Sequence, residues 1–242
     1  MSVLYFVTPA WQRFELTAVC LQQRQRVIDD LAQHGIEAHQ VVVADDENLD
    51  IARSMGMHTV EQNNDGLGRR WNDGNVYAAE HGAEWFVPIG SDSWIDPAYF
   101  YDLPRPKYTR TSGLYAVVAD KLLECNVTSK RLPAGPYVFH RSTLEPSGFR
   151  PTEEANSKHT DHSTLAGLGR IRWEHKDLHP LQYVGFRQEP MMTSYASLKR
   201  RWGVREHDDP WHELAQHYPL DLVEKARAVL SSAQEETPLE AA

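Results

Sequence analysis

Three short polar segments each follow an apolar run typical of a buried strand, and their side chains could bind a charged ligand. The segments are Thr8-Pro9, Asp45-Asp46-Glu47-Asn48 and Gly90-Ser91-Asp92-Ser93. Ligands of an open α/β sheet bind outside the carboxyl ends of its strands, so these positions are the first candidates for a site. Carboxylates there can hold a hard divalent cation. Each segment alone also fits an ordinary loop, and it is their recurrence that favours a shared site.

A glycine-containing segment, Asn64 to Gly68, precedes a run with helical spacing and invites comparison with nucleotide-binding loops. In a dinucleotide-binding Gly-x-Gly-x-x-Gly motif starting at Gly66, the third glycine would fall at Trp71. An indole there would block the close approach of helix and sheet that glycine permits. The chain also contains no Gly-Lys-Ser/Thr, which excludes a P-loop.

Strands that alternate with helices must position these segments. Apolar and β-branched runs predict strands, and recurring apolar residues followed by Gly35, Gly56 and Gly82 predict helices between them. The predicted strands are Val3–Val7, Val41–Ala44, His58–Glu61 and Trp85–Ile89, and the predicted helices are Glu15–His34, Ile51–Met55 and Arg69–His81. This alternation predicts a Rossmann-like α/β fold with a mostly parallel central sheet and right-handed crossovers.

The second half of the chain is less regular. Short apolar runs at Leu114–Ala119 and Tyr137–Phe139 are separated by proline, glycine and charge, and Leu220–Ser231 predicts a final amphipathic helix. We therefore predict a ligand-binding half at 1–100, an acceptor-side half of the same domain at 101–205, and a C-terminal helical extension and tail at 206–242.

The order of these motifs resembles the family 2 inverting glycosyltransferases of GT-A fold. That family has a strand ending in Pro, a strand ending in Asp-Asp, a loop and helix with Asn-x-Gly-x-Gly-x-x-x-Asn-x-Gly, and a strand ending near Asp-x-Asp. The corresponding residues are Val7-Thr8-Pro9, Val43-Ala44-Asp45-Asp46, Asn64-Asp65-Gly66-Leu67-Gly68-Arg69-Arg70-Trp71-Asn72-Asp73-Gly74 and Gly90-Ser91-Asp92-Ser93-Trp94-Ile95-Asp96-Pro97.

The resemblance implies a binding site for a nucleotide sugar of the UDP or GDP type. Its donor-binding residues would be Thr8, Pro9, Asp45, Asp46, Asn64, Gly66, Gly68, Asn72, Ser91 and Asp92. Thr8, Pro9 and Asp45 or Asp46 would line the base and ribose. Asn72 and the loop from Gly66 to Gly68 would approach the ribose, diphosphate or sugar.

The same resemblance implies a divalent cation, Mn²⁺ or Mg²⁺, that offsets charge on the diphosphate leaving group. Asp92 is the expected carboxylate ligand and His179, with His175 as the alternative, the late histidine ligand. Two positions depart from the family pattern. Its first Asp falls on Gly90, and its Arg before Asn falls on Trp71 with Arg70 one place early, which leaves metal dependence open.

Inversion at the sugar carbon needs a general base that takes the proton of the acceptor. Ser147 to Pro151 resembles the family's Gly-Gly-Phe-Asp segment, and Thr160-Asp161-His162 falls where a Glu-Asp pair precedes a helix. Asp161 is therefore the expected catalytic base, and a helix N-terminal residue is the ordinary alternative. Trp94, beside Asp92, could stack on an acceptor, although packing under the loop is the commoner role.

Composition narrows the partners. The formal net charge is −9, which disfavours nucleic acid as a partner without excluding it. No apolar stretch reaches the length of a membrane span, and the N-terminus lacks a basic region, so we expect a cytoplasmic protein without a membrane partner. Cys20 and Cys125 have neither zinc-site spacing nor a disulfide pattern.

These patterns predict metal-assisted transfer of a sugar from a nucleotide sugar to a hydroxyl acceptor, with inversion. Two alternatives remain. A nucleotidyltransferase shares a related fold but normally has a glycine-rich basic loop after the first strand, where this chain has Thr8-Pro9-Ala10-Trp11. A non-catalytic module that binds sugar nucleotides or glycans would explain Gly90 in place of a carboxylate.

Overall fold

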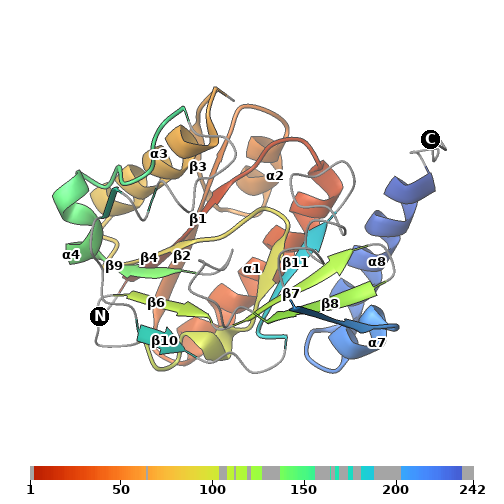
Figure 1. Ribbon diagram of the computed structural model, residues 1–242. Helices are drawn as coiled ribbons and strands as arrows, with labels where there is room; N and C mark the ends of the chain where they lie inside the picture. Colours follow the sequence, from red (N-terminus) through yellow and green to blue (C-terminus); the bar gives the residue numbers. More distant parts are fainter. Residues whose placement is uncertain are drawn as a thin grey trace.

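The computed structural model (Figure 1) describes residues 3–63, 65–103, 108–111, 113–118, 121–126, 137–155, 164, 167–168, 174–176, 181–187 and 203–235. Within these residues, strands and helices alternate through the first half of the chain. The elements of that half are β1 (Val3–Pro9), α1 (Phe14–Gln33), β2 (Glu37–Ala44), α2 (Asn48–Ser54), β3 (His58–Glu61), α3 (Leu67–Glu80) and β4 (Trp85–Pro88). Each predicted strand and helix of this half is therefore confirmed, with small shifts at the ends.

A seven-stranded sheet in the order β10-β6-β9-β4-β1-β2-β3 forms the centre of the molecule. The strands β3, β2, β1 and β4 run parallel, as predicted, whereas β9 (Val138–His140) is antiparallel to β4 and to β6 (Tyr108–Thr111). The short β10 (Glu174–Lys176) pairs parallel with β6. The sheet is thus an α/β sheet with an antiparallel extension.

Helices cover both faces of the parallel strands. Along β1, Leu4 and Phe6 pack in one core with residues of α1, while Tyr5 and Val7 pack in another with residues of α3. Successive side chains of a strand point to opposite faces, so an apolar run without alternation is expected where both faces are buried. Gly74 lets α3 approach closely, because a Cβ there would lie 2.4 Å from Val7 Cγ1.

A second sheet, which the sequence patterns did not predict, has five strands in the order β12-β8-β7-β11-β5. Its strands are β5 (Ser93–Ile95), β7 (Gly113–Val118), β8 (Lys121–Asn126), β11 (Tyr183–Arg187) and β12 (Gly203–His207). Trp94 is fully buried and meets Phe186 edge to face, with ring centroids 4.8 Å apart. Packing, and not exposure for stacking, is therefore the role of Trp94.

The remaining described helices lie on the second half of the chain. They are η1 (Pro97–Tyr99), α4 (Arg141–Leu144), η2 (Glu145–Ser147), α7 (Pro210–Ala215) and α8 (Leu220–Glu235). The predicted final helix is confirmed as α8, which packs on α1 at the side of the molecule away from α3 and α4 (Figure 1). In the described part of the chain, no helix is long and apolar enough to cross a membrane.

Candidate active site at the carboxyl ends of β1, β2 and β4

The strand order places a reversal of direction beside β1. The chain moves from β1 to β2 and β3 on one side, and then returns to add β4 on the other side. In open α/β sheets, ligands bind at such a switch point, outside the carboxyl ends of the strands. The segments after β1 and β4, which carry Arg13 and Asp92, are therefore in the expected position for a ligand site.

Two arginines hold the carboxylate of Asp92. Asp92 Oδ2 accepts hydrogen bonds from Arg13 Nη1 at 3.1 Å and from Arg187 Nη1 at 2.9 Å, while Oδ1 accepts one from the Ser93 hydroxyl at 3.1 Å. Burial acts to raise the pKa of Asp92, but the charges of Arg187 and Arg13 outweigh it and leave the pKa below its ordinary value. Asp92 is therefore an ionised member of a cluster with two guanidinium groups.

The segment between β1 and α1 has an unusual backbone. Gln12 and Arg13 have φ angles of 52° and 49°, in the left-handed region, where a residue with a side chain costs about 1 to 2 kcal/mol. Asp46 helps to hold this conformation, because its Oδ2 accepts the Gln12 N–H at 2.8 Å. The Asn48 amide donates to the Gln12 carbonyl at 3.2 Å. The strained turn that presents Arg13 is thus tied to the segment after β2.

Arg70 joins the same two strand ends from below. Its side chain is 1% exposed, and its guanidinium donates to Asp45 Oδ1 at 2.6 Å and to the Ala10 carbonyl at 2.5 Å. The adjacent Trp71 packs against the core between α3 and β1. The arginine that stands one place early in the family pattern therefore still reaches the acidic segment after β2.

Three other predicted donor-binding residues lie beside this cluster. Thr8 and Pro9 belong to β1 itself, not to the loop that was expected there, and both are buried. Ser91 lies under Arg13, whose Nη2 is 3.4 Å from the Ser91 hydroxyl oxygen. A role for these residues in donor binding stays a prediction.

The glycines of the predicted donor loop make room for another backbone segment. A Cβ on Gly66 would lie 2.2 Å from the Glu154 carbonyl oxygen, and one on Gly68 would lie 1.9 Å from that of Glu153. The N–H of Arg69, in the first turn of α3, donates to the Glu154 carbonyl at 3.2 Å. Residues 152–155 therefore cover the start of α3, where the resemblance implies a diphosphate.

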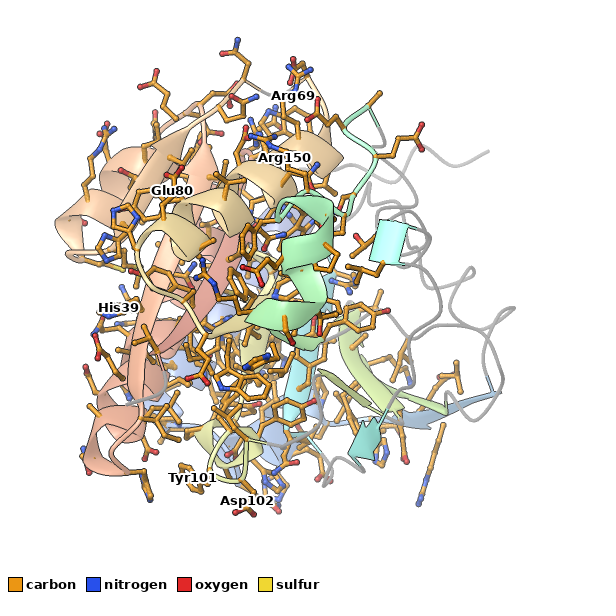
Figure 2. All side chains as sticks on the ribbon, turned by 90° about the vertical axis from the view of Figure 1, so that its left-hand side faces the viewer. His39, Arg69, Glu80, Tyr101, Asp102 and Arg150 are labelled. Atoms are coloured by element: carbon orange, nitrogen blue, oxygen red, sulfur yellow. The ribbon has the colours of Figure 1, made fainter. Side chains whose placement is uncertain are left out.

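Asn72 takes part in the same contact. It is fully buried, its Nδ2 donates to the Thr152 carbonyl at 2.7 Å, and its Oδ1 accepts the Thr152 N–H at 3.1 Å. On the surface above, Arg69 and Arg150 both form ion pairs with Glu154, and Figure 2 shows the two arginines at the same end of α3. The motif thus has a packing role, and its predicted part in donor binding is untested.

The described residues do not form a metal site around Asp92. One of its carboxylate oxygens faces two guanidinium groups, and no group of three or more His, Cys, Asp or Glu in the described ranges is placed to hold a metal ion. His179, the predicted second ligand, lies outside the described residues, as do Asn64 and the predicted base Asp161.

Sequence reasoning missed Arg13 and Arg187. Arg13 lies between a strand end and a helix, and Arg187 is the last residue of β11, directly after the predicted apolar run at Leu181–Phe186. The rule that favours residues at strand ends would have found both, if it had been applied to basic as well as acidic side chains.

Comparison with solved structures identifies the fold class as that of GT-A-type glycosyltransferases. S. aureus TarS, residues 1–349, superposes with a TM-score of 0.53 at 14% identity, over 77% of this chain and 60% of that one. The same TarS fragment in complex with UDP also has a TM-score of 0.53. A mannosyltransferase from Pyrobaculum calidifontis, in complex with GDP-Man and Mn²⁺, has a TM-score of 0.54 at 12% identity, over 98% of this chain and 76% of that one.

The present chain thus spans about 60% of the TarS fragment. No protein-family model and no curated protein matches the sequence. At these identities the likeness establishes the fold alone.

Proposed function

We propose that this protein is a glycosyltransferase that moves a sugar from a UDP- or GDP-type nucleotide sugar to a hydroxyl acceptor, with inversion at the sugar carbon. The observation that carries the proposal is the cluster of Arg13, Asp92 and Arg187 at the switch point of a GT-A-type fold. Sugar nucleotides bound to two of the similar structures, UDP in TarS and GDP-Man in the mannosyltransferase, support the same class of ligand.

The charge of the cluster suits such a donor. A nucleotide sugar carries a diphosphate, and guanidinium groups recognise phosphate oxygens with paired N–H donors. Arg13 and Arg187 bring two positive charges to one carboxylate, in a chain whose overall net charge is −9. A cationic spot at the switch point of an acidic protein favours an anionic ligand at that place.

In the proposed reaction, the acceptor oxygen attacks the anomeric carbon of the donor sugar from the side opposite the diphosphate. The bond from that carbon to the diphosphate oxygen breaks, and the nucleoside diphosphate leaves with the bonding pair. A base takes the proton of the acceptor hydroxyl. Asp161 remains the proposed base.

The other donor contacts remain as the resemblance implies them. Asp45 and Asp46 lie at the end of β2, where they would meet the base and ribose. Mn²⁺ or Mg²⁺, held by Asp92 with His179, is part of the sequence prediction. The side chains described around Asp92 do not fit such an ion, so the proposed reaction takes no step through a metal.

A thermal-shift screen tests the proposal. Nucleoside diphosphates and their sugar conjugates would be added with and without Mn²⁺, because a ligand that binds only the folded state raises its Tm. At a ligand concentration of 100 times Kd, we expect a rise of about 5 to 10 °C for a chain of this size. Release of the nucleoside diphosphate from the hit, and its loss in Asp92→Ala, would then establish turnover.

Two results would count against the proposal. Failure of every sugar nucleotide to shift the Tm, in either condition, would exclude a nucleotide-sugar enzyme. Binding without release of nucleoside diphosphate, with acceptors of all hydroxyl classes present, would favour the non-catalytic binding module.

A further inference from the structure

The surroundings of Asp92 are unsuited to a dication. A divalent metal on a carboxylate oxygen lies about 2.0 to 2.6 Å away, depending on the ion. Asp92 Oδ2 already has guanidinium nitrogens at 2.9 and 3.1 Å, so a metal on that oxygen would lie close to two positive charges. Coulomb repulsion opposes that arrangement, and it is strongest where solvent is excluded, as around this buried carboxylate.

Two glycines leave room for the cluster. Gly90 occupies the position of the family's first carboxylate, and a Cβ there would lie 2.5 Å from Asp92 Oδ1. Gly185 precedes Arg187 by one turn of the strand pleat, and a Cβ there would lie 2.9 Å from Arg187 Nη2. A second carboxylate at Gly90 would thus collide with Asp92 as it is placed here, and any side chain at Gly185 would displace Arg187.

The arginines are also held in place before any ligand arrives. Arg13 follows a turn with two residues in the left-handed region, which Asp46 and Asn48 fix through Gln12. Backbone strain of this kind persists only where surrounding contacts maintain it, and it gathers at functional sites. The side chain of Arg13 is 30% exposed and that of Arg187 13%, so the cluster borders solvent.

From these contacts we infer that Arg13 and Arg187 receive the diphosphate of the donor in place of a divalent cation, and that nucleotide binding needs no metal. Asp92 then acts as a positioning residue that orients the two guanidinium groups. This inference rests on the proposed function, because it assigns the groups that meet the donor's diphosphate.

Calorimetric titration of UDP and GDP into the full chain tests the inference, first in EDTA and then with Mn²⁺. We expect the nucleotide that binds to do so equally well in both. Arg13→Gln and Arg187→Gln should each weaken binding about 10- to 100-fold, the range for a lost hydrogen bond to a charged group. Arg13→Lys, which keeps the charge but not the paired donors, should fall between them and the unaltered protein.

Two controls separate a diphosphate contact from a general loss of structure. Arg26→Gln removes an exposed arginine of the same helix, roughly 20 Å further along its axis, and should leave binding unchanged. The matching monophosphate should lose less affinity than the diphosphate in Arg13→Gln and Arg187→Gln. Circular dichroism melting curves identify any variant that is unfolded, and Arg13→Lys then decides the result for Arg13.

The outcomes are distinguishable. Binding that requires Mn²⁺, or that is unchanged in both arginine variants, overturns the inference and leaves the proposed function standing. Absence of nucleotide binding with and without Mn²⁺ overturns both. Equal affinity in EDTA and Mn²⁺, with a loss in both arginine variants and none in Arg26→Gln, supports the inference.

Discussion

Asn72 uses both ends of its side-chain amide to hold the backbone of Thr152, donating to the carbonyl at 2.7 Å and accepting the N–H at 3.1 Å. The two residues are 80 positions apart in the sequence. The pair fastens residues 151–155 to the first turns of α3, which in turn lies on β1 and β2. A motif that resembles a donor-binding loop therefore also joins the two halves of the chain.

Replacing Asn72 separates these two roles. Asn72→Ala leaves a buried N–H and a buried carbonyl without partners, so we expect the free energy of unfolding to fall by about 2 to 4 kcal/mol. Urea denaturation measures the change, and Asn63→Ala, at an exposed position nearby, should stay within about 0.5 kcal/mol of the unaltered protein. Unchanged stability with loss of nucleotide binding would instead make Asn72 a donor contact.

Gly68→Ala tests whether close backbone contact or helix propensity governs the start of α3. Propensity alone favours alanine in a helix by about 1 kcal/mol. The added Cβ would lie 1.9 Å from the Glu153 carbonyl oxygen, which belongs to the backbone and cannot rotate away. We therefore expect a loss of stability in urea denaturation. A gain would mean that residues 152–155 do not rest on α3 in solution.

Arg70 should matter more for stability than a surface arginine does. Arg70→Met removes a fully buried guanidinium that binds both Asp45 and the Ala10 carbonyl, and leaves both acceptors without it. Because the side chain of Asp45 is 27% exposed, water can replace part of the contact, and we expect a cost of about 2 kcal/mol. Arg53→Gln, which breaks an exposed pair with Asp50, provides the matched comparison and should cost about 0.5 kcal/mol or less.

The histidines beside β2, β3 and α3 predict a loss of stability in weak acid. Partial burial, followed by the nearby His39 and His81, lowers the pKa of His58, whose Nδ1 is 3.0 Å from the Tyr77 hydroxyl. The unfolded chain therefore takes up this proton at a higher pH than the folded chain does. Below the ordinary histidine pKa the unfolded state binds more protons, so stability falls as pH falls.

Urea midpoints measured from about pH 7 down to about pH 5 should show this fall. His58→Gln should flatten it, whereas the exposed His212→Gln should not. An identical slope in all three proteins would mean that other groups cause the pH dependence.

The local pattern of the first half of the chain was sufficient to predict its elements. Runs such as Val41–Ala44 have no polar alternation because both faces of β2 are covered, and Gly35, Gly56 and Gly82 follow their helices with φ angles of 74°, 71° and 84°. These signals arise from neighbouring residues, so they can be read without knowing the rest of the fold. The second sheet lacked them, because its strands are short and come from distant parts of the chain.

By itself, the sequence determined where the strands of the parallel sheet end, and so which segments meet at its carboxyl edge. Only the tertiary structure decided what Asp92 does there. Arg13 and Arg187 come from positions 79 residues before it and 95 residues after it, and no local pattern records contacts across such separations. The charge state and partners of a side chain depend on what the fold places within a few ångströms of it. A metal ligand and an arginine-bound carboxylate therefore look alike in the sequence.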